Sequence, residues 1–382
     1  MKVVDLFCGC GGLSLGFEKA GMDVVAAFDN WVDALNVYRQ NFAHPAIKAD
    51  LMNVEDAVKN ILHYEPDMII GGPPCQDFSS AGKRDENNGR GDLTVSYAHI
   101  ISEVKPEWFV MENVERILRA QKLQEAMEIF RKAGYGLTYT VLNAALCGVP
   151  QKRKRFVMIG KLNADDDFMK EVLLENLSDH EMSVKEYFGD RLSISYYYRH
   201  PRSYARRGIF STSEPSATIR GVNRPMPKGY TLHPGDPVNS LEGIRPLTSK
   251  ERSMIQTFPE DFDFEGTKTN IEQITFTHVL SIASIKPIVA TSVTSLEPTI
   301  AAMANRNVSI AFIANPPTNA FFIFFLFSIL FTTCMTEKIA EKANINNPNT
   351  AIINLGSPSV KLKPRCTLVN DKSINKIITL AI

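Results

Sequence analysis

The first 160 residues alternate short apolar runs with longer segments in which apolar positions recur every three or four residues. The short runs have the length of buried strands, and the longer segments have the period of amphipathic helices. Strands separated by helical crossovers predict an α/β fold with a mostly parallel sheet and helices on both faces. The predicted strands are 3–7, 24–28, 68–70, 108–111, 138–142 and 156–159, and the predicted helices are 13–20, 32–41, 54–62, 97–104 and 117–133.

Beyond residue 160 the periodic pattern weakens. Residues 163–190 are acidic and predict a helix or linker that leaves the sheet. Residues 191–245 are rich in Arg, Tyr, Pro and Gly, which predicts a small, loop-rich domain. Thr248 and Glu251 then have the spacing of a capping box, so a further helix is expected to begin there.

The last part of the chain differs in composition. Between residues 274 and 335 the only charged side chains are Lys286, Glu297 and Arg306. The almost purely apolar block within it, 320–331, is shorter than the ~20 residues that a membrane helix needs. We therefore expect a sheet domain over 1–165, a loop-rich domain over 180–245, a helical return to the sheet domain over 246–273, and a divergent segment over 274–382.

Charge and cysteine usage narrow the class of protein. The chain has 382 residues with 42 basic and 42 acidic side chains, so contacts with a polyanion must come from local patches rather than from a net field. Its six cysteines lack disulfide or zinc spacing, which predicts a reduced, cytoplasmic setting and no structural metal. The chain opens directly on a predicted strand, so we expect no signal peptide and no membrane anchor.

A glycine-rich turn, residues 5–12, joins the first predicted strand to the first helix, and its glycines allow a ligand to approach the backbone. Asp29 and Asp50 follow the next strands, where they would bond ribose hydroxyls and an adenine amino group, and Trp31 would lie against a purine. The alternative is a tight turn with solvated acids. The loop is compatible with both NAD and S-adenosylmethionine. Asp5 favours the second, because that ligand carries an amino group and a positive charge, whereas a pyrophosphate prefers an uncluttered helix N-terminus.

A second turn, Gly72-Pro73-Pro74-Cys75-Gln76, follows the predicted strand 68–70. Proline fixes φ and donates no N–H, so this turn is stiff, and it lies where open α/β sheets bind ligands. A rigidly held cysteine at that place suits a nucleophile. The alternative is that Cys75 is a small core residue, as most free cysteines are.

A carboxyl and a run of cations are predicted at the same sheet edge. Glu112 and Asn113 end the strand that begins at residue 108, and the run 151–155 (Gln-Lys-Arg-Lys-Arg) precedes the last predicted strand. The alternatives are that Glu112 starts a helix, where the helix dipole favours an acid, and that the cations form a solvated face. A cysteine, a carboxyl and cations at one edge favour a shared catalytic site.

With these residues in this order, the chain resembles the DNA (cytosine-5)-methyltransferases of bacterial restriction–modification systems. The resemblance covers about residues 1–273. It is carried by the segments 5–12, 72–79, 112–114, 151–155 and 245–248. It implies a class I, Rossmann-like methyltransferase fold, S-adenosyl-L-methionine as cofactor, double-stranded DNA as substrate, a cognate restriction endonuclease as functional partner, a monomer and no metal.

The resemblance also implies a mechanism. The Cys75 thiolate would attack C6 of cytosine, and Glu112 would hold N3 and the exocyclic amine, so that C5 becomes nucleophilic toward the methyl donor. Arg153 and Arg155 would steady the ring oxygen and the Glu112 side, and cationic neighbours lower the pKa of a thiol. The target must leave the duplex stack, and the loop 79–91 would close over it.

Further roles follow from the same resemblance. The loop-rich domain over 180–245 would be the target-recognition domain, with Thr218 and Ile219 next to the everted base. The implied cofactor residues are Asp5, Phe7, Gly9, Gly11, Gly12, Leu13, Asp29, Trp31, Asp50 and Pro73. The implied DNA and target residues are Gln76, Ser79, Asn113, Gln151, Thr218, Arg220 and Arg245.

The chain departs from the family after Gln273. The family continues with a Gly-Asn-Ala-Val-Pro type of segment, whereas Ile274-Thr275-Phe276 follows here. We hypothesise a frameshift or foreign junction near Gln273, which translation of the gene in its other frames would test. Three alternative functions stay open: a catalytically impaired DNA-binding remnant, an RNA cytosine-5 methyltransferase, and an NAD dehydrogenase, which leaves the Cys75 and Glu112 motifs unexplained.

Overall fold

The computed structural model describes residues 1–74, 92–201, 203, 205–221 and 223–264, and the backbone of 366–368 and 378–380. The chain divides into two compact units, Met1–Val293 and Thr294–Ile382. In the second unit, the described backbone forms one antiparallel pair, β12 (Cys366–Leu368) with β13 (Ile378–Leu380).

A seven-stranded sheet in the order β3-β2-β1-β4-β5-β8-β6 forms the framework of the first unit. Every neighbouring pair from β3 to β5 is parallel, and β8 runs antiparallel to both β5 and β6. The strand order reverses between β1 and β4, which is where open α/β sheets form their ligand crevice. The strands are β1 (Lys2–Leu6), β2 (Asp23–Asp29), β3 (Ala46–Lys48), β4 (Met68–Gly71), β5 (Trp108–Val114), β6 (Tyr135–Asn143) and β8 (Lys154–Leu162).

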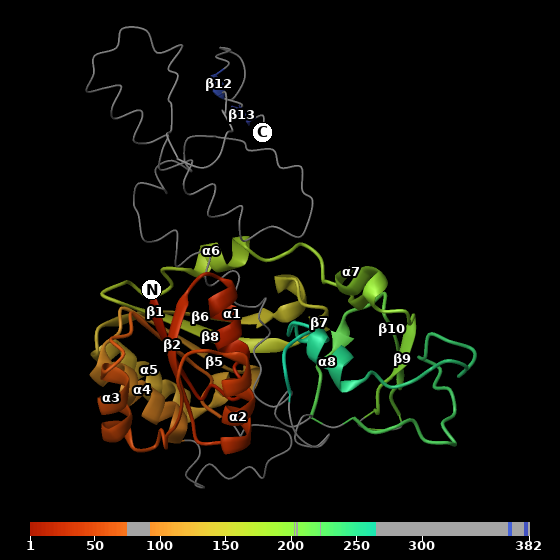
Figure 1. Cartoon of the computed structure of the whole chain (residues 1–382), viewed down its shortest axis with the longest axis horizontal. Coiled ribbons are helices and arrows are strands. Elements are labelled where there is room, and N and C mark those ends of the chain that lie inside the picture. Colours follow the sequence, from red (N-terminus) through yellow and green to blue (C-terminus); the bar gives the residue numbers. More distant parts are fainter. Residues whose placement is uncertain are drawn as a thin grey trace. The chain divides into compact units, whose positions relative to one another are not determined.

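Apolar cores on both faces of the sheet explain the apolar runs of the strands. The larger core joins alternate strand residues to α3 (Val54–Leu62), α4 (Asp92–Val104) and α5 (Gln121–Lys132). The other core joins the remaining strand positions to α1 (Gly12–Lys19) and α6 (Lys170–Glu175). Figure 1 shows α3, α4 and α5 together on one side of the strands, with α1 and α2 (Val32–Asn41) on the other. The predicted fold class is confirmed.

Two local predictions need correction. The predicted helix over 117–133 is interrupted, because Ala120 has extended backbone angles (φ −86°, ψ 132°) between a 3₁₀ turn, Glu115–Arg119, and α5. The strand region expected before Asp50 was given no bounds; in the structure it is β3, which has only three residues. The capping box at the start of α8 (Ser249–Ile255) is confirmed: Thr248 accepts from Glu251 N, and the Glu251 side chain bonds the Thr248 backbone.

The chain after residue 180 builds a core of its own. This core contains Val184 and Phe188 of α7 (Val184–Phe188), Tyr197 of β9 (Tyr196–Tyr198) and Ile255 of α8. Strand β9 pairs antiparallel with β10 (Ile209–Ser211). Two further short 3₁₀ turns are Ala144–Cys147 and Gly189–Arg191.

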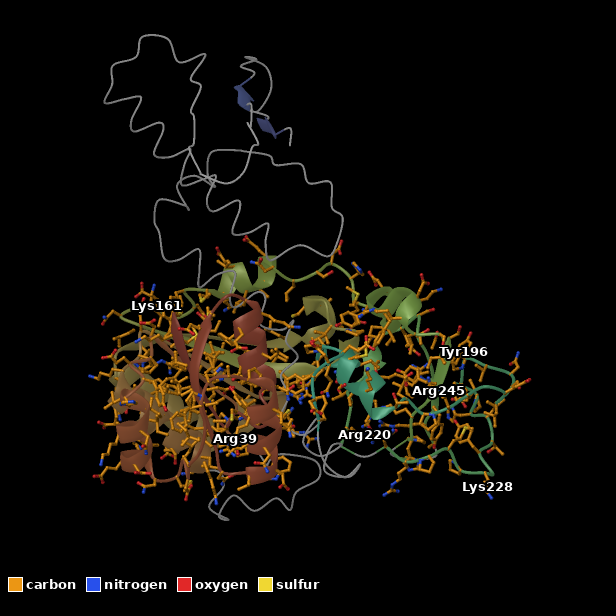
Figure 2. The ribbon with its side chains drawn as sticks, viewed as in Figure 1. Arg39, Lys161, Tyr196, Arg220, Lys228 and Arg245 are labelled. Atoms are coloured by element: carbon orange, nitrogen blue, oxygen red, sulfur yellow. The ribbon has the colours of Figure 1, made fainter. Side chains whose placement is uncertain are left out.

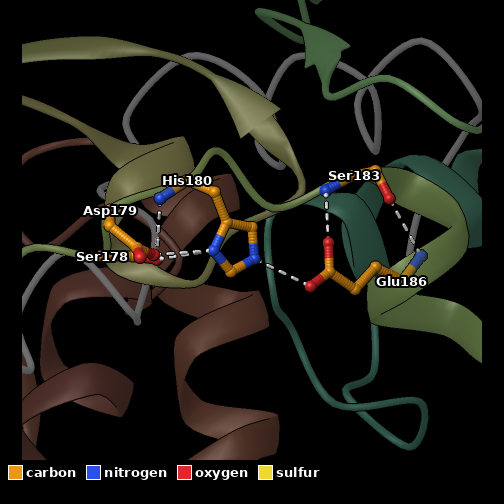
Figure 3. A network of polar contacts seen from close by, with 5 residues as sticks. All are labelled: Ser178, Asp179, His180, Ser183 and Glu186. Carbon is orange, nitrogen blue, oxygen red and sulfur yellow. Dashed lines mark hydrogen bonds and ion pairs between the residues drawn. The ribbon is translucent and has the colours of Figure 1, made fainter.

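A histidine fixes the chain where it enters this second region. His180 Nδ1 lies 3.0 Å from Asp179 Oδ1, and its Nε2 lies 3.0 Å from Glu186 Oε1 (Figure 3). Glu186 also closes the capping box of α7, where its backbone N–H donates to Ser183 Oγ at 3.1 Å. The bonds from Asp179 and Glu186 raise the pKa of His180.

Candidate functional site

The turn between β1 and α1 has a backbone shape that few sequences adopt. Phe7, Gly9 and Gly11 all have positive φ, at 58°, 54° and 91°. Asp29, at the end of β2, holds this turn from the side. Its Oδ2 accepts from Gly9 N and its Oδ1 from Trp31 N, both at 2.8 Å. Both carboxylate oxygens of Asp29, which was predicted to bond ribose hydroxyls, therefore hold this turn.

Gly11 is required for two separate reasons. Its φ of +91° is strained for any residue with a side chain. A Cβ built on it would also fall 2.3 Å from Cε2 of Phe42, which packs after α2. The glycine therefore allows α1 to start against the aromatic side chains of the neighbouring helix, and Gly12 begins the helix itself.

A cavity of about 60 Å³ opens at the carboxyl ends of the parallel strands, beside this turn. Asp29 and Asp50 supply carboxylates to it, and Asp50 Oδ1 also accepts from Met52 N at 3.0 Å. Five lining residues were not among the predicted cofactor residues, and one of them is Pro74, which follows the predicted Pro73. Asn30, Ala49 and Leu51 adjoin the predicted acids, and Leu93 comes from α4, which no local pattern connects with them. The lining is Phe7, Asp29, Asn30, Ala49, Asp50, Leu51, Pro74 and Leu93.

Other predicted cofactor residues lie behind this cavity. Leu13 packs in the core shared by α1 and the sheet. Asp5 has no exposed surface, and its Oδ2 accepts from Ser14 Oγ at 2.6 Å, while its Oδ1 has no hydrogen-bond partner. Burial, with a further contribution from the charge of Asp29, raises the pKa of Asp5 to about 7. Asp5 thus supports the turn from below.

The Gly72-Pro73-Pro74 turn is fastened to β5. Asn113 Nδ2 donates to the carbonyl of Pro73 at 3.0 Å, and both residues are buried. Asn113 therefore holds the turn with its amide nitrogen, while its Oδ1 accepts from Val114 N at 2.8 Å. A Cβ on Gly72 would lie 3.3 Å from Glu112 Oε2, so glycine keeps this turn and the Glu112 carboxyl close together. Cys75, Gln76, Ser79 and the predicted loop 79–91 lie outside the described residues.

The predicted carboxyl and cations meet between β5 and β8. Arg155 Nε lies 2.8 Å from Glu112 Oε1, and both side chains are about one-sixth exposed (17% and 16%). Arg153 is buried, and its Nε has no hydrogen-bond partner. Burial, with the nearby Arg155 charge, lowers the pKa of Arg153 to about 9, so this guanidinium remains a cation at neutral pH. Glu112 is therefore held by one oxygen and faces Gly72 with the other.

Two predicted target residues form a seam between the sheet and the later region. Strand β7 (Gln151–Lys152) pairs in parallel with β11 (Ser216–Ala217). Gln151 Oε1 accepts from Ile219 N at 2.8 Å, and Thr218 Oγ1 donates to the Lys152 carbonyl at 2.7 Å. Gln151 and Thr218 therefore both bond across this seam, where they hold the two regions together.

The cations of the later region surround a larger hollow. Figure 2 shows Arg220, Lys228 and Arg245 on this region, away from Arg39 and Lys161 on the sheet side. Arg245 bonds both oxygens of Glu251, at 2.8 and 2.6 Å, and Arg220 donates to the His200 carbonyl at 2.5 Å. A cavity of about 750 Å³ borders β11, and its cationic lining is Lys152, Arg199, Arg206, Arg207 and Arg220.

The described cysteines are poor nucleophiles. Burial raises the pKa of the Cys8 thiol well above its usual value, that of Cys10 to about 12 and that of Cys147 to about 11. Across the part of the chain that the structure describes, no cluster of His, Cys, Asp or Glu has the arrangement of a metal site. Within that same part, every helix is too short or too polar to cross a membrane.

Known proteins resemble this chain in sequence over most of its length. "Type II methyltransferase M.HindV" of Haemophilus influenzae is 57% identical over 275 residues, which cover 72% of this chain and 90% of that protein. "Type II methyltransferase M.HgiDI" of Herpetosiphon aurantiacus is 53% identical over 274 residues, which cover 72% of this chain and 88% of that protein.

Solved structures share the fold. The methyltransferase EhMeth of Entamoeba histolytica superposes with a TM-score of 0.58 at 16% identity, covering 78% of this chain and 99% of that one. The family of C-5 cytosine-specific DNA methylases matches residues 1–283, so residues from 284 onward lie outside the match. The glycine turn, the Glu112–Arg155 pair and the Gln151 seam all fall inside it, and this chain belongs to the C-5 cytosine-specific DNA methylase family.

Proposed function

We propose that this chain transfers a methyl group from S-adenosyl-L-methionine to C5 of an everted cytosine in double-stranded DNA, through a covalent bond between Cys75 and C6. One observation carries the proposal. Glu112 has one oxygen held by Arg155 at 2.8 Å, and its other oxygen faces the proline turn that leads directly into Cys75.

The residues around the smaller cavity fit an adenosyl group. Phe7, Leu51 and Leu93 give apolar surface, and Asp29 and Asp50 give acceptors for hydroxyl and amino groups. The cavity lies at the point where the strand order reverses, as ligand crevices of this fold do. Bound there, S-adenosyl-L-methionine would supply an electrophilic methyl group.

The protein's own groups would act on the cytosine ring. The Cys75 thiolate would add to C6, and Glu112 Oε2 would hold N3 and the exocyclic amine as charge develops in the ring. Arg155 keeps Glu112 oriented, and the buried Arg153 adds positive charge beside it. Loss of the C5 proton to a solvent base and departure of Cys75 as the thiolate would restore the C5–C6 double bond.

A duplex hides C5 and C6 inside the base stack, so the target must leave it. The cavity of about 750 Å³ beside β11 is lined by five cationic side chains that would face the DNA. Two of them are already paired, Lys152 with Glu181 and Arg207 with Glu214, both at 2.6 Å. The Gln151 and Thr218 bonds fix the position of this cationic lining against the sheet edge that carries Glu112. These contacts support DNA as the substrate, since they offer cations at fixed spacing from the proposed catalytic edge.

The test uses DNA that contains 5-fluorocytosine, in which fluorine replaces the C5 hydrogen and cannot be eliminated, so the covalent adduct is trapped. With S-adenosyl-L-methionine, the full chain should give a protein band on a denaturing gel that is shifted to higher mass by covalently attached DNA. Cys75→Ser should abolish this band, and Cys147→Ser, which changes a buried thiol of raised pKa, should retain it. DNA binding without an adduct in the unmodified chain would instead support a DNA-binding remnant, and an adduct formed only with RNA would support an RNA enzyme.

A further inference from the structure

Arg207, in the lining of the larger cavity, has a guanidinium that two neighbouring side chains orient. Its Nη2 donates to Glu214 Oε2 at 2.6 Å, and its Cζ lies 4.4 Å from the centre of the Phe210 ring. Glu214 is itself fixed, because its Oε1 accepts from Ser211 N at 3.0 Å. The guanidinium is therefore held by an ion pair and by an aromatic face, while the Arg207 side chain remains 35% exposed.

The backbone that carries Arg207 is held as well. Asp236 Oδ1 accepts from Gly208 N at 3.1 Å, and Gly208 directly follows Arg207. The other oxygen of Asp236 accepts from Tyr230 OH at 2.7 Å and from His233 N at 2.8 Å. One carboxylate thus joins the start of β10 to the loop that contains His233, and His233 lines the same cavity as Arg207.

A guanidinium held in this way is suited to recognise guanine. Among the described contacts, the bond to Glu214 uses one of the five N–H donors of Arg207, and all five lie in one plane. Two parallel N–H donors match N7 and O6 on the major-groove edge of guanine. A long side chain loses rotamer freedom when it binds, so orientation before binding reduces that cost.

Glu214 favours a base edge over a phosphate as the group that Arg207 contacts. Its carboxylate lies 2.6 Å from the guanidinium and offsets the positive charge there. A phosphate is an anion, so Glu214 would repel it while Arg207 attracted it. The edge of guanine is uncharged and escapes this repulsion. The preceding residue, Arg206, lines the same cavity from an exposed position and suits a phosphate contact.

The cavity also connects Arg207 with the proposed catalytic edge. Its lining includes Lys152 and Thr218, which bond one another across the seam between the two regions. Lys152 ends β7, and two positions separate it from Arg155, which bonds Glu112. We therefore expect a duplex that delivers its cytosine to Glu112 to extend along the lining that contains Arg207.

We propose that Arg207 is a specificity-determining residue that reads one guanine of the recognition sequence through N7 and O6, and that Glu214, Phe210 and Asp236 position it. This inference rests on the proposed function, because it takes double-stranded DNA as the substrate. The contacts of Arg207 with Glu214 and Phe210 carry it, since together they fix the plane of the donors and offset the charge.

The test selects DNA from a double-stranded library of mixed sequence, with the full chain and S-adenosylhomocysteine, so that binding is measured without methyl transfer. The unmodified chain should enrich a sequence with guanine at one or more fixed positions. Arg207→Lys keeps a cation beside Glu214 but lacks the planar fork, so it should lose the preference for one such guanine by about tenfold. Replacing that guanine by 7-deazaguanine, which lacks N7, should weaken binding of the unmodified chain about fivefold and leave binding of Arg207→Lys nearly unchanged.

Arg206→Ala is the matched control, because it removes a neighbouring cation from the same cavity. It should weaken binding to all sequences alike, keep the preference for guanine and reduce the salt slope by about 1. An Arg207→Lys chain that keeps every guanine preference, or that loses a position other than guanine, would overturn the inference.

The 7-deazaguanine measurement on the unmodified chain does not depend on how any variant folds. Insensitivity to this change at every enriched guanine, or the enrichment of no sequence, would also overturn the guanine contact. The proposed function is tested separately by replacing S-adenosylhomocysteine with S-adenosyl-L-methionine. If the selected DNA then acquires no methyl group, the proposed reaction fails, whereas the guanine contact stands or falls on the binding results.

Discussion

Replacing Asp5 by Asn should change how the stability of the fold depends on pH. The carboxyl has no exposed surface, and burial raises its pKa from 3.8 to about 7. The folded chain therefore keeps this proton at pH values where the unfolded chain has lost it. Stability from this group is complete below pH 4 and is lost as the pH rises toward 7. At 1.36 kcal/mol per pKa unit, ionised Asp5 lowers the free energy of unfolding by about 4 kcal/mol above pH 8.

Urea unfolding at several pH values from 5 to 8 measures this effect. The unmodified chain should lose stability more steeply than Asp5→Asn, by about 1.4 kcal/mol per pH unit at most, up to pH 7. The new amide leaves an N–H unpaired, which costs about 1–3 kcal/mol but is independent of pH. Asp23→Asn, at an exposed acid, serves as the control. Parallel curves for the unmodified chain and Asp5→Asn would refute the reasoning.

Three further substitutions test other contacts. Gly72→Ala places a Cβ 3.3 Å from Glu112 Oε2, so kcat for methyl transfer should fall about tenfold while Tm changes little. An unchanged kcat would contradict the proposed role of this turn. Gly160→Ala places a Cβ 2.0 Å from a ring carbon of buried Phe109, so chemical unfolding should show a loss of about 2 kcal/mol or more. Arg245→Ala removes the bidentate bond to Glu251 and should cost about 1 kcal/mol of stability, while the salt dependence of DNA binding stays the same.

The periodic pattern predicted the sheet domain, because strands of a parallel sheet are buried on both faces and therefore consist of successive apolar residues. It also predicted the start of α8, since a capping box is a local signal at Thr248 and Glu251. The pattern could not give the bounds of β3 before Asp50, because its three residues are placed by pairing with β2. The break at Ala120 was equally invisible, because helix-forming residues flank it on both sides.

For the candidate site, the sequence predicted individual residues but not the contacts between them. Asp29, Asp50 and Glu112 follow strands, so topology alone brings them to one edge. The bond from Asn113 to the Pro73 carbonyl spans forty positions of sequence and depends on the register of β4 with β5. His44 lies in a connection between α2 and β3, and only the packing of α1 against α2 brings it to Tyr38 and Glu18.

The core after residue 180 is assembled from both ends of the segment that it encloses. Val184 and Phe188 come from the entering chain, and Met254 and Ile255 come from the returning chain. Both ends of the intervening stretch therefore lie in one core, and this stretch is called a cassette below. Recombination between relatives can exchange such a cassette while the flanking apolar residues are retained. Under the proposed function, exchange of this stretch would change the DNA sequence preference in one genetic event, without redesign of the sheet domain.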